Sequence, residues 1–199
     1  MPDVSYVAHI AWRGRNAMLN IPNTLTLLRI AAIPAILIAL DEAQFGIAFA
    51  LFVAAGVTDS VDGAIARLTN TRTDLGAYLD PLADKGLVLS LLLKLTWMGL
   101  VPQWAFTIIL TRDIVCMTGY VLLFFLTGER LEILPTLVGK LATFLQLCGL
   151  AVTLVALAYP HLKGALPGDA IFAGAAFATA YAGIQYVGRG LRWYQTRPT

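Results

Sequence analysis

Long apolar runs alternate with short polar connections along the chain from residue 24 onward. Each run is about 17–25 residues long, which at about 1.5 Å of rise per helical residue is enough to cross a hydrocarbon core of roughly 30 Å. The pattern therefore predicts an all-α, polytopic integral membrane protein with about six transmembrane helices. The predicted spans cover residues 24–40, 46–66, 82–98, 104–127, 138–159 and 170–188.

The segments outside these runs define the expected domain organisation. Residues 23–192 are expected to form one six-span domain. Residues 1–22 are expected to form an N-terminal cytoplasmic segment, in which apolar positions beside Arg13 and Arg15 are typical of an amphipathic helix on a membrane surface. A disordered segment is the alternative. Residues 193–199 are expected to form a cytoplasmic tail.

Positive charge collects on one side of this predicted topology. Because Lys and Arg accumulate in cytoplasmic connections, both termini and the connection 67–80 are predicted to be cytoplasmic. The expected location is a bacterial cell (inner) membrane, with the mitochondrial inner membrane as the alternative. The residues on the positive side are Arg13, Arg15, Arg67, Arg72, Arg130, Lys140, Arg189, Arg192 and Arg197.

The composition agrees with a membrane protein and excludes several other classes. Hydrophobic residues make up 58% of the chain and charged residues 13%, whereas soluble domains carry roughly 25% charged residues. A secreted domain, a coiled coil and a disordered chain are therefore excluded. The formal net charge of +2 leaves no basic surface, so nucleic acid is not expected as a partner.

Four aspartates stand where an apolar helix ordinarily has none. Asp59 and Asp62 are three residues apart at the end of the second span, and Asp80 and Asp84 are four residues apart at the start of the third. On helices each pair shares one face, and the short connection brings the two faces together. Four such carboxylates repel one another, and an all-oxygen ligand set favours a hard cation, Mg²⁺ or Mn²⁺. The alternative is a set of interfacial acids paired with neighbouring Arg and Lys.

The residues between the aspartates point to phosphate. Gly63 and Ala66 are small enough to let a ligand approach the helix backbone. Arg67 offers a fixed cation for a phosphate oxygen, while Thr73 and Gly76 in the predicted connection offer a hydroxyl and an accessible backbone. Acids, a metal and a phosphate-binding Arg at a membrane interface indicate phosphoryl-group chemistry on a lipid.

These residues resemble the signature of the CDP-alcohol phosphatidyltransferase family. The matching pattern is Asp59-x2-Asp62-Gly63-x2-Ala66-Arg67-x8-Gly76-x3-Asp80-x3-Asp84. The resemblance extends over nearly the whole chain and implies about six transmembrane helices and a homodimer. It also implies transfer of a phosphatidyl group from CDP-diacylglycerol to an acceptor hydroxyl, with release of CMP.

The resemblance also implies roles for individual residues. Two divalent cations, Mg²⁺ or Mn²⁺, would be held by the four aspartates, with Asp59 and Asp80 bridging both ions, Asp62 on the first and Asp84 on the second. Asp84 would also be the catalytic base that takes the proton from the acceptor hydroxyl. The cytidine diphosphate group would contact Asn23, Thr26, Asp62, Gly63, Arg67, Thr73 and Gly76.

The segment 80–85 resembles the branch of the family that uses glycerol-type acceptors, which includes cardiolipin synthases and phosphatidylglycerophosphate synthases. Arg112 and Lys140 are the candidate acceptor contacts. Ala142 stands where the glycerophosphate enzymes have a second lysine, so the expected acceptor is phosphatidylglycerol, with glycerol 3-phosphate as the alternative. Two structural interpretations stay open: Arg112 and Asp113 form an ion pair that only holds a span in place, and Lys140 only anchors a helix end.

Two other classes fit the sequence less well. Intramembrane prenyltransferases also gather aspartates around Mg²⁺, but in two separate motifs on a longer chain. A cation transporter would need acids deep in several spans, whereas the fifth and sixth runs are apolar except at their ends.

Overall fold

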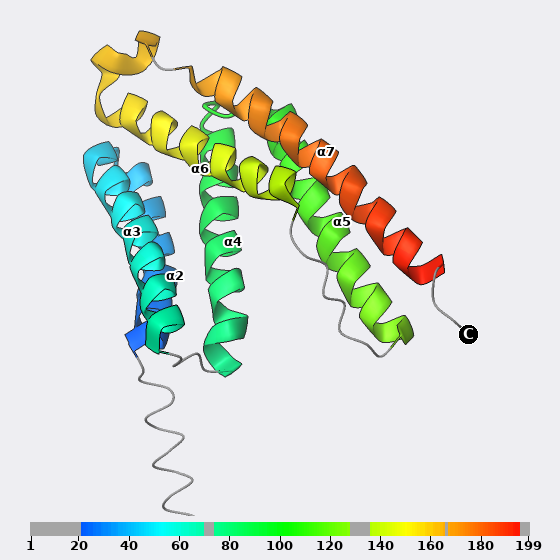
Figure 1. Cartoon of the computed structure of the whole chain (residues 1–199). Coiled ribbons are helices and arrows are strands. Elements are labelled where there is room, and N and C mark those ends of the chain that lie inside the picture. The colour runs from blue at the N-terminus through cyan, green and yellow to red at the C-terminus, as the bar shows by residue number, and fades with distance from the viewer. Residues whose placement is uncertain (1–20, 70–73, 128–135, 166, 196–199) are drawn as a thin grey trace, which may run out of the picture. The chain divides into compact units, whose positions relative to one another are not determined.

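The computed structural model describes residues 21–69, 74–127, 136–165 and 167–195. Of residues 21–25, 59–69, 74–82 and a few positions toward later helix ends, only the backbone is described. Every regular element in the described ranges is helical, which confirms the all-α prediction (Figure 1). The elements are α2 (Ile21–Asp41), α3 (Phe45–Thr69), α4 (Asp74–Trp97), α5 (Gln103–Thr127), α6 (Leu137–Ala158), the short 3-10 helix η1 (Pro160–Ala165) and α7 (Gly168–Gln195).

One predicted connection is wrong. The polar stretch 67–80 was expected to link two spans, but α3 continues to Thr69 and α4 already begins at Asp74. Hydropathy marks where an apolar stretch ends, whereas helical hydrogen bonding continues through polar residues of adequate helix propensity. Gly76, expected in a loop, therefore lies in the first turn of α4. Thr73 and the predicted N-terminal segment up to residue 20 lie outside the described residues.

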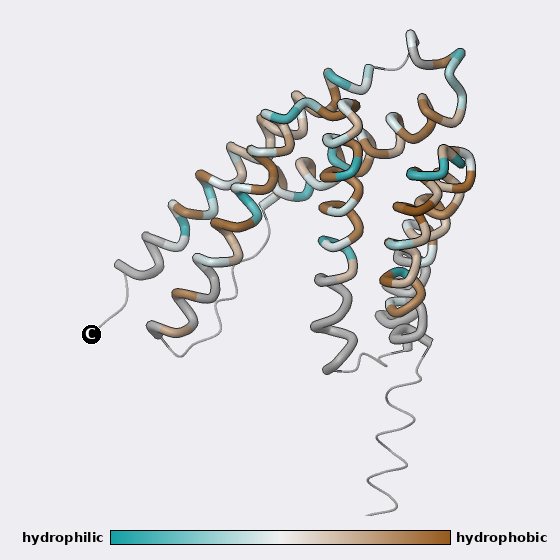
Figure 2. Tube along the Cα trace, turned by 180° about the vertical axis from the view of Figure 1, so that it is seen from behind, coloured by the Kyte–Doolittle hydropathy of each residue, from teal (hydrophilic) through white to brown (hydrophobic). Residues whose placement is uncertain are grey.

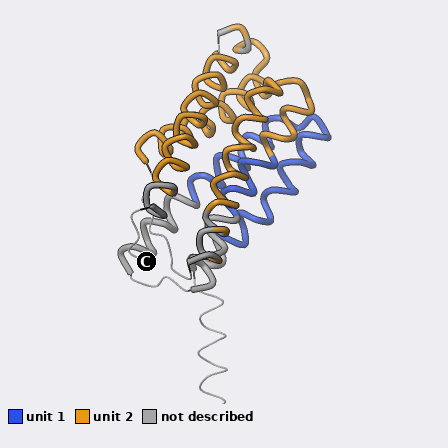
Figure 3. Tube along the Cα trace, turned by 90° about the vertical axis from the view of Figure 1, so that its right-hand side faces the viewer, with its two compact units in different colours: residues 1–90 blue, residues 91–199 orange. Residues whose placement is uncertain are grey.

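The chain divides into two compact units, residues 1–90 and 91–199 (Figure 3). In the first unit α2 packs against α3, and Ile36, Leu40, Ala48 and Phe52 of these two helices are buried. Only a short turn separates α2 from α3, with Ala43 in the left-handed conformation at φ 57°. The turn makes the two helices antiparallel neighbours.

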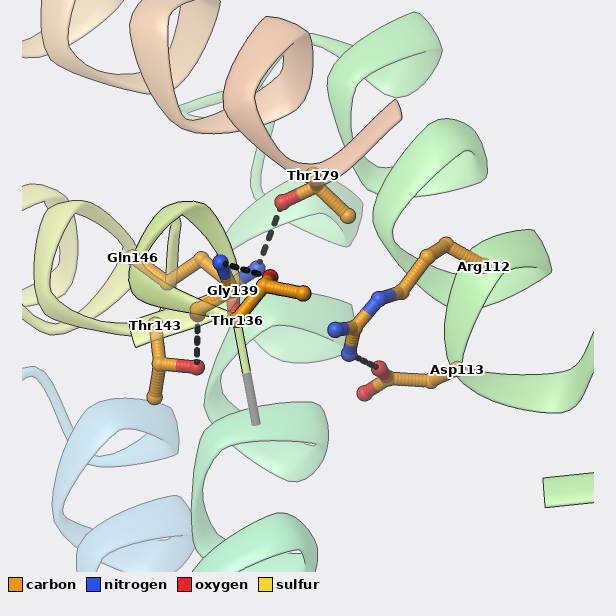
Figure 4. A network of polar contacts seen from close by, with 7 residues as sticks. All are labelled: Arg112, Asp113, Thr136, Gly139, Thr143, Gln146 and Thr179. Atoms are coloured by element: carbon orange, nitrogen blue, oxygen red, sulfur yellow. Dashed lines mark hydrogen bonds and ion pairs between the residues drawn. The ribbon is translucent and has the colours of Figure 1, made fainter. Parts of the chain in front are cut away.

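In the second unit α7 packs against both α5 and α6. Leu150 and Leu154 of α6 and Phe172 of α7 are fully buried, and the Phe172 ring lies against Gly149 of α6. One buried polar contact crosses the same interface, because Gln146 Nε2 donates to Thr179 Oγ1 at 3.0 Å (Figure 4). A polar pair of this kind satisfies both groups inside an apolar interface.

The C-terminus of α4 shows why a glycine stands at residue 99. The amide of Leu100 donates to the carbonyl of Leu95 at 2.9 Å, and the amide of Gly99 donates to that of Thr96 at 3.0 Å. This Schellman motif needs a left-handed residue, and Gly99 supplies it with φ 72°. The helix therefore stops at a defined point before Pro102 begins the approach to α5.

The helices expose large apolar side chains to their surroundings. Two of the six long described helices, over Leu137–Ala158 and Gly168–Gly190, are long and apolar enough to cross a membrane. Leu137 and Phe177 are 84% and 73% exposed, and hydrophobic residues recur along every described helix (Figure 2). Apolar surface on this scale is unusual on a soluble monomer and suits contact with lipid.

The contact between Gly149 and Phe172 provides a test of the packing in the second unit. A Cβ atom on Gly149 would lie 2.8 Å from Cε1 of Phe172, whose side chain is fully buried. We expect Gly149→Val to destabilise the protein by about 1–3 kcal/mol, because the ring has no space to move. The measurement is the Tm of the detergent-purified protein by circular dichroism.

Gly119→Val is the matched control, because a Cβ at this α5 position would meet nothing within 4 Å. A drop in Tm that is no larger for Gly149→Val than for Gly119→Val contradicts the packing assigned to Phe172.

Candidate functional site

The helical backbone places the predicted metal-binding residues on α3 and α4. Asp59 and Asp62 lie in the second half of α3, and Asp80 and Asp84 lie in the first half of α4. Residues three or four apart on a helix share a face, so the assumption behind the predicted pairing is correct. Of the four side chains, the structure describes that of Asp84, so their convergence on a metal stays a prediction.

Asp84 is held by a residue that the sequence analysis did not assign to the site. Arg29 of α2 donates from Nη1 to Oδ1 of Asp84 at 2.7 Å. The Arg29 side chain is 1% exposed, whereas that of Asp84 is 48% exposed. The carboxylate is therefore fixed from the protein interior and keeps about half of its surface accessible.

A signal for Arg29 was present in the sequence. It is the one charged residue in the apolar run 24–40, and a guanidinium in such a run is expensive to bury unless it is paired. The sequence shows that a partner is needed but not which carboxylate provides it. The partner lies 55 residues away, and only the fold identifies it.

Arg29 also lines a cavity of about 280 Å³ between α2 and α3. Small side chains form most of its wall, and it reaches Thr58, the residue before Asp59. The guanidinium thus belongs to a region where α2 approaches both helices of the acidic motif.

The residues predicted to bind the cytidine diphosphate group are only partly described. Thr26 is fully buried in α2, one turn before Arg29. The contacts of Thr26 with a nucleotide stay a prediction. The other members of the set lie outside the described side chains: Asn23, Asp62, Gly63, Arg67, Thr73 and Gly76.

The predicted acceptor residue Arg112 lies in the second unit, on α5. Its Nη1 donates to Oδ1 of the adjacent Asp113 at 2.7 Å (Figure 4). The two residues thus form the ion pair that the sequence left open. Its aliphatic stem passes α7 at Gly183, where an added Cβ would lie 3.0 Å from Cγ. Within the described part of the chain, the buried Nε of Arg112 makes no hydrogen bond. The ion pair therefore leaves part of the guanidinium's donor capacity unused.

The guanidinium of Arg112 points toward the first turn of α6 (Figure 4). A Cβ atom on Gly139 would lie 3.5 Å from Nη2, which is ordinary van der Waals distance, so the cation lies close beside the first turn of the helix. Thr136 caps this helix, accepting from the Gly139 amide at 2.9 Å. Lys140 follows and is exposed.

This arrangement suits an anion. The first amides of a helix have no intrahelical acceptor and carry the positive end of the helix dipole. Arg112 and Lys140 add two cations, and Asp113 offsets one of them. The start of α6 therefore combines helix amides with one net positive charge, which suits a phosphate group.

Comparison with known proteins identifies the family. The model of the CDP-alcohol phosphatidyltransferase family matches residues 19–183. The match covers well over half of the chain and includes the acidic motif on α3 and α4. The chain belongs to the CDP-alcohol phosphatidyltransferase family.

Individual relatives carry two kinds of name. A Mycobacterium tuberculosis protein named probable phosphatidylglycerophosphate synthase is 35% identical over 90% of this chain and 85% of its own length. The CDP-diacylglycerol–glycerol-3-phosphate 3-phosphatidyltransferase of Bacillus subtilis is 36% identical over 69% of this chain and 78% of its own length. The cardiolipin synthase (CMP-forming) of Homo sapiens is 36% identical over 69% of this chain and 50% of its own length.

Proposed function

We propose that this protein is a membrane enzyme that transfers a phosphatidyl group from CDP-diacylglycerol to phosphatidylglycerol, forming cardiolipin and releasing CMP. The observation that carries the reaction class is the family match over residues 19–183, which includes the aspartates on α3 and α4. The names of the relatives support a glycerol-type acceptor.

The four aspartates Asp59, Asp62, Asp80 and Asp84 would hold two divalent cations, Mg²⁺ or Mn²⁺. The family is generally dependent on divalent cations. The donor set fits such ions, because carboxylate oxygens are their preferred ligands and the Asp84 carboxylate remains half exposed. When bound, the ions would polarise the pyrophosphate and stabilise the leaving CMP.

The protein's own residues would position the substrates and move one proton. Asp84 would accept the proton of the acceptor hydroxyl as its oxygen attacks the phosphorus of the phosphatidyl group. A new P–O bond forms to the acceptor, the P–O bond to CMP breaks, and CMP leaves. Arg67, Gly63 and Thr26 would hold the cytidine diphosphate group during the transfer.

The lipid substrates require a membrane setting. We propose that all six long helices span the bilayer, that both termini and the active site are cytoplasmic, and that the protein forms a homodimer. The exposed apolar side chains of α5, α6 and α7 support a lipid-facing surface. The tails of the substrate would then stay in the bilayer while the headgroup reacts at its surface.

The net charge around Arg112 and the apolar cavity beside it support phosphatidylglycerol as acceptor. The single net positive charge of Arg112, Asp113 and Lys140 matches a phosphodiester, which has one negative charge, better than the doubly charged glycerol 3-phosphate. Arg112 also lines a cavity of about 470 Å³ between α5 and α7, and apolar residues make up most of its wall. Such a cavity suits an acyl chain, which glycerol 3-phosphate lacks.

Glycerol 3-phosphate is the second candidate acceptor. The Mycobacterium tuberculosis relative, which matches 90% of this chain, is named a phosphatidylglycerophosphate synthase. We expect purified protein with CDP-diacylglycerol and Mn²⁺ or Mg²⁺ to release CMP with phosphatidylglycerol and not with glycerol 3-phosphate. Turnover with glycerol 3-phosphate alone would establish the second candidate, and no CMP with either acceptor would contradict a glycerol-type acceptor.

Substitution of Asp84 tests the proposed base. We expect Asp84→Asn to fold, because an amide can still accept from Arg29, but to lose about 10²-fold or more in kcat, because the amide takes up no proton. CMP release and a circular dichroism melt provide the two readouts. Asp41→Asn, at the exposed end of α2, is the matched control and should stay within twofold of wild type. A folded Asp84→Asn variant with normal kcat excludes the base assignment.

Substitution of Arg112 tests the acceptor site. We expect Arg112→Met to raise the KM for the acceptor about 10- to 100-fold, the effect of losing a hydrogen bond to a charged group, with a much smaller change in the KM for CDP-diacylglycerol. Arg189→Met, an exposed position of α7, is the control. Equal changes in both KM values would show that Arg112 and Asp113 only stabilise the helix packing.

A further inference from the structure

We infer that Arg29 is a positioning residue for Asp84: it fixes the carboxylate from inside the protein so that the accessible part of the group faces the reacting molecules. This inference rests on the proposed function, because it assumes that Asp84 binds a cation and accepts the acceptor proton. Arg29 itself would touch neither substrate.

The first support is the asymmetry of the ion pair. An ion pair that served only to anchor two helices could be buried on both sides, whereas here the side chains are 1% and 48% exposed. Arg29 is sealed in the interior, and Asp84 lies at the boundary. The guanidinium therefore supplies a rigid donor to a carboxylate that is about half exposed.

The second support is the energetic cost of Arg29. Removing a guanidinium from water costs several kcal/mol even after relaxation, and an apolar side chain of similar size would fill the same space more cheaply. The 2.7 Å contact with Asp84 offsets this cost. The buried guanidinium thus binds a residue of the acidic motif, not an arbitrary group in the core.

The third support is the packing next to the ion pair. A Cβ atom on Gly86 would lie 3.5 Å from Cδ1 of Ile33, so α2 and the first part of α4 are in contact one turn beyond the pair. Arg29 precedes Ile33 by four residues, and Asp84 precedes Gly86 by two. The apolar contact and the ion pair therefore occur in the same register of the two helices.

The chemical consequence is control of one carboxylate oxygen. With Oδ1 held by Arg29, the rotation of the Asp84 carboxylate is restricted, and its remaining lone pairs have a defined direction. Carboxylates that bind metals are commonly held by such hydrogen bonds, and loss of the partner typically lowers metal affinity or activity by about 10- to 100-fold. Arg29 would thus act on both the cation site and the rate through Asp84.

The experiment measures Mn²⁺ binding and turnover on the full-length protein in detergent. Mn²⁺ binding in the presence of CDP is followed by electron paramagnetic resonance, and kcat and KM come from CMP release. We expect Arg29→Met to weaken Mn²⁺ binding and to lower kcat about 10- to 100-fold, with the KM for CDP-diacylglycerol within about threefold of wild type.

Arg29→Lys keeps a cation in the buried position but replaces the planar fork with a single, shorter donor. We expect a loss between those of wild type and Arg29→Met, which is partial rescue by the conservative variant. Lys94→Met is the charge control, since it removes a cation ten residues further along α4, about 15 Å from Asp84 along the helix axis. It should leave Mn²⁺ binding unchanged.

A second arm tests whether Arg29 acts through Asp84. In the Asp84→Ala background, Arg29→Met should change Mn²⁺ affinity by less than twofold, because the group that Arg29 positions is gone. An undiminished effect of Arg29→Met in that background overturns the inference.

Two further outcomes overturn it. One is a folded Arg29→Met protein with a lower Tm but normal Mn²⁺ affinity and kcat, which shows a purely structural ion pair. The other applies if Arg29→Met does not fold. Arg29→Lys is then the test, and an Mn²⁺ affinity and kcat within twofold of wild type reject the positioning role. Absence of CMP release by the wild-type protein contradicts the proposed function instead, so the two failures are distinguishable.

Discussion

The structure depends on one constraint: polar and charged groups in apolar helices must find partners within the protein. Arg29 meets Asp84 across α2 and α4, and Gln146 meets Thr179 across α6 and α7. In lipid an unsatisfied polar group costs several kcal/mol, so each of these contacts selects one relative position of two helices. The packing of the apolar residues follows the same registers.

The same constraint explains where chemistry is possible. Arg29 is buried and serves Asp84, whose carboxylate stays half exposed. The guanidinium of Arg112 is bound by Asp113 and still reaches the first turn of α6 beside Gly139. In each unit a charged group, Asp84 in the first and Arg112 in the second, is therefore fixed by an ion pair and remains partly exposed. A catalytic or binding site needs this combination of fixed geometry and access.

The helices themselves were predictable because apolar periodicity and length are local properties of the chain. Each of the six apolar runs corresponds to one helix. The junction of α3 and α4 was harder to predict, because hydropathy falls at residue 67 while the helical backbone continues to Thr69 and resumes at Asp74. The helical spacing of Asp59 with Asp62 and of Asp80 with Asp84 was also readable, because it depends only on 3.6 residues per turn.

The sequence by itself determined the all-helical class, the family and the spacing of the aspartates, because all three depend on residues that are close together in the sequence. It also showed that Arg29 and Arg112 are charges in apolar surroundings. The tertiary structure decided their surroundings: Arg29 bonds to a carboxylate 55 residues away, and the stem of Arg112 crosses α7 at Gly183. Contacts between helices depend on register and on the absence of side chains at particular glycines, and neither is encoded by the pattern of any single helix.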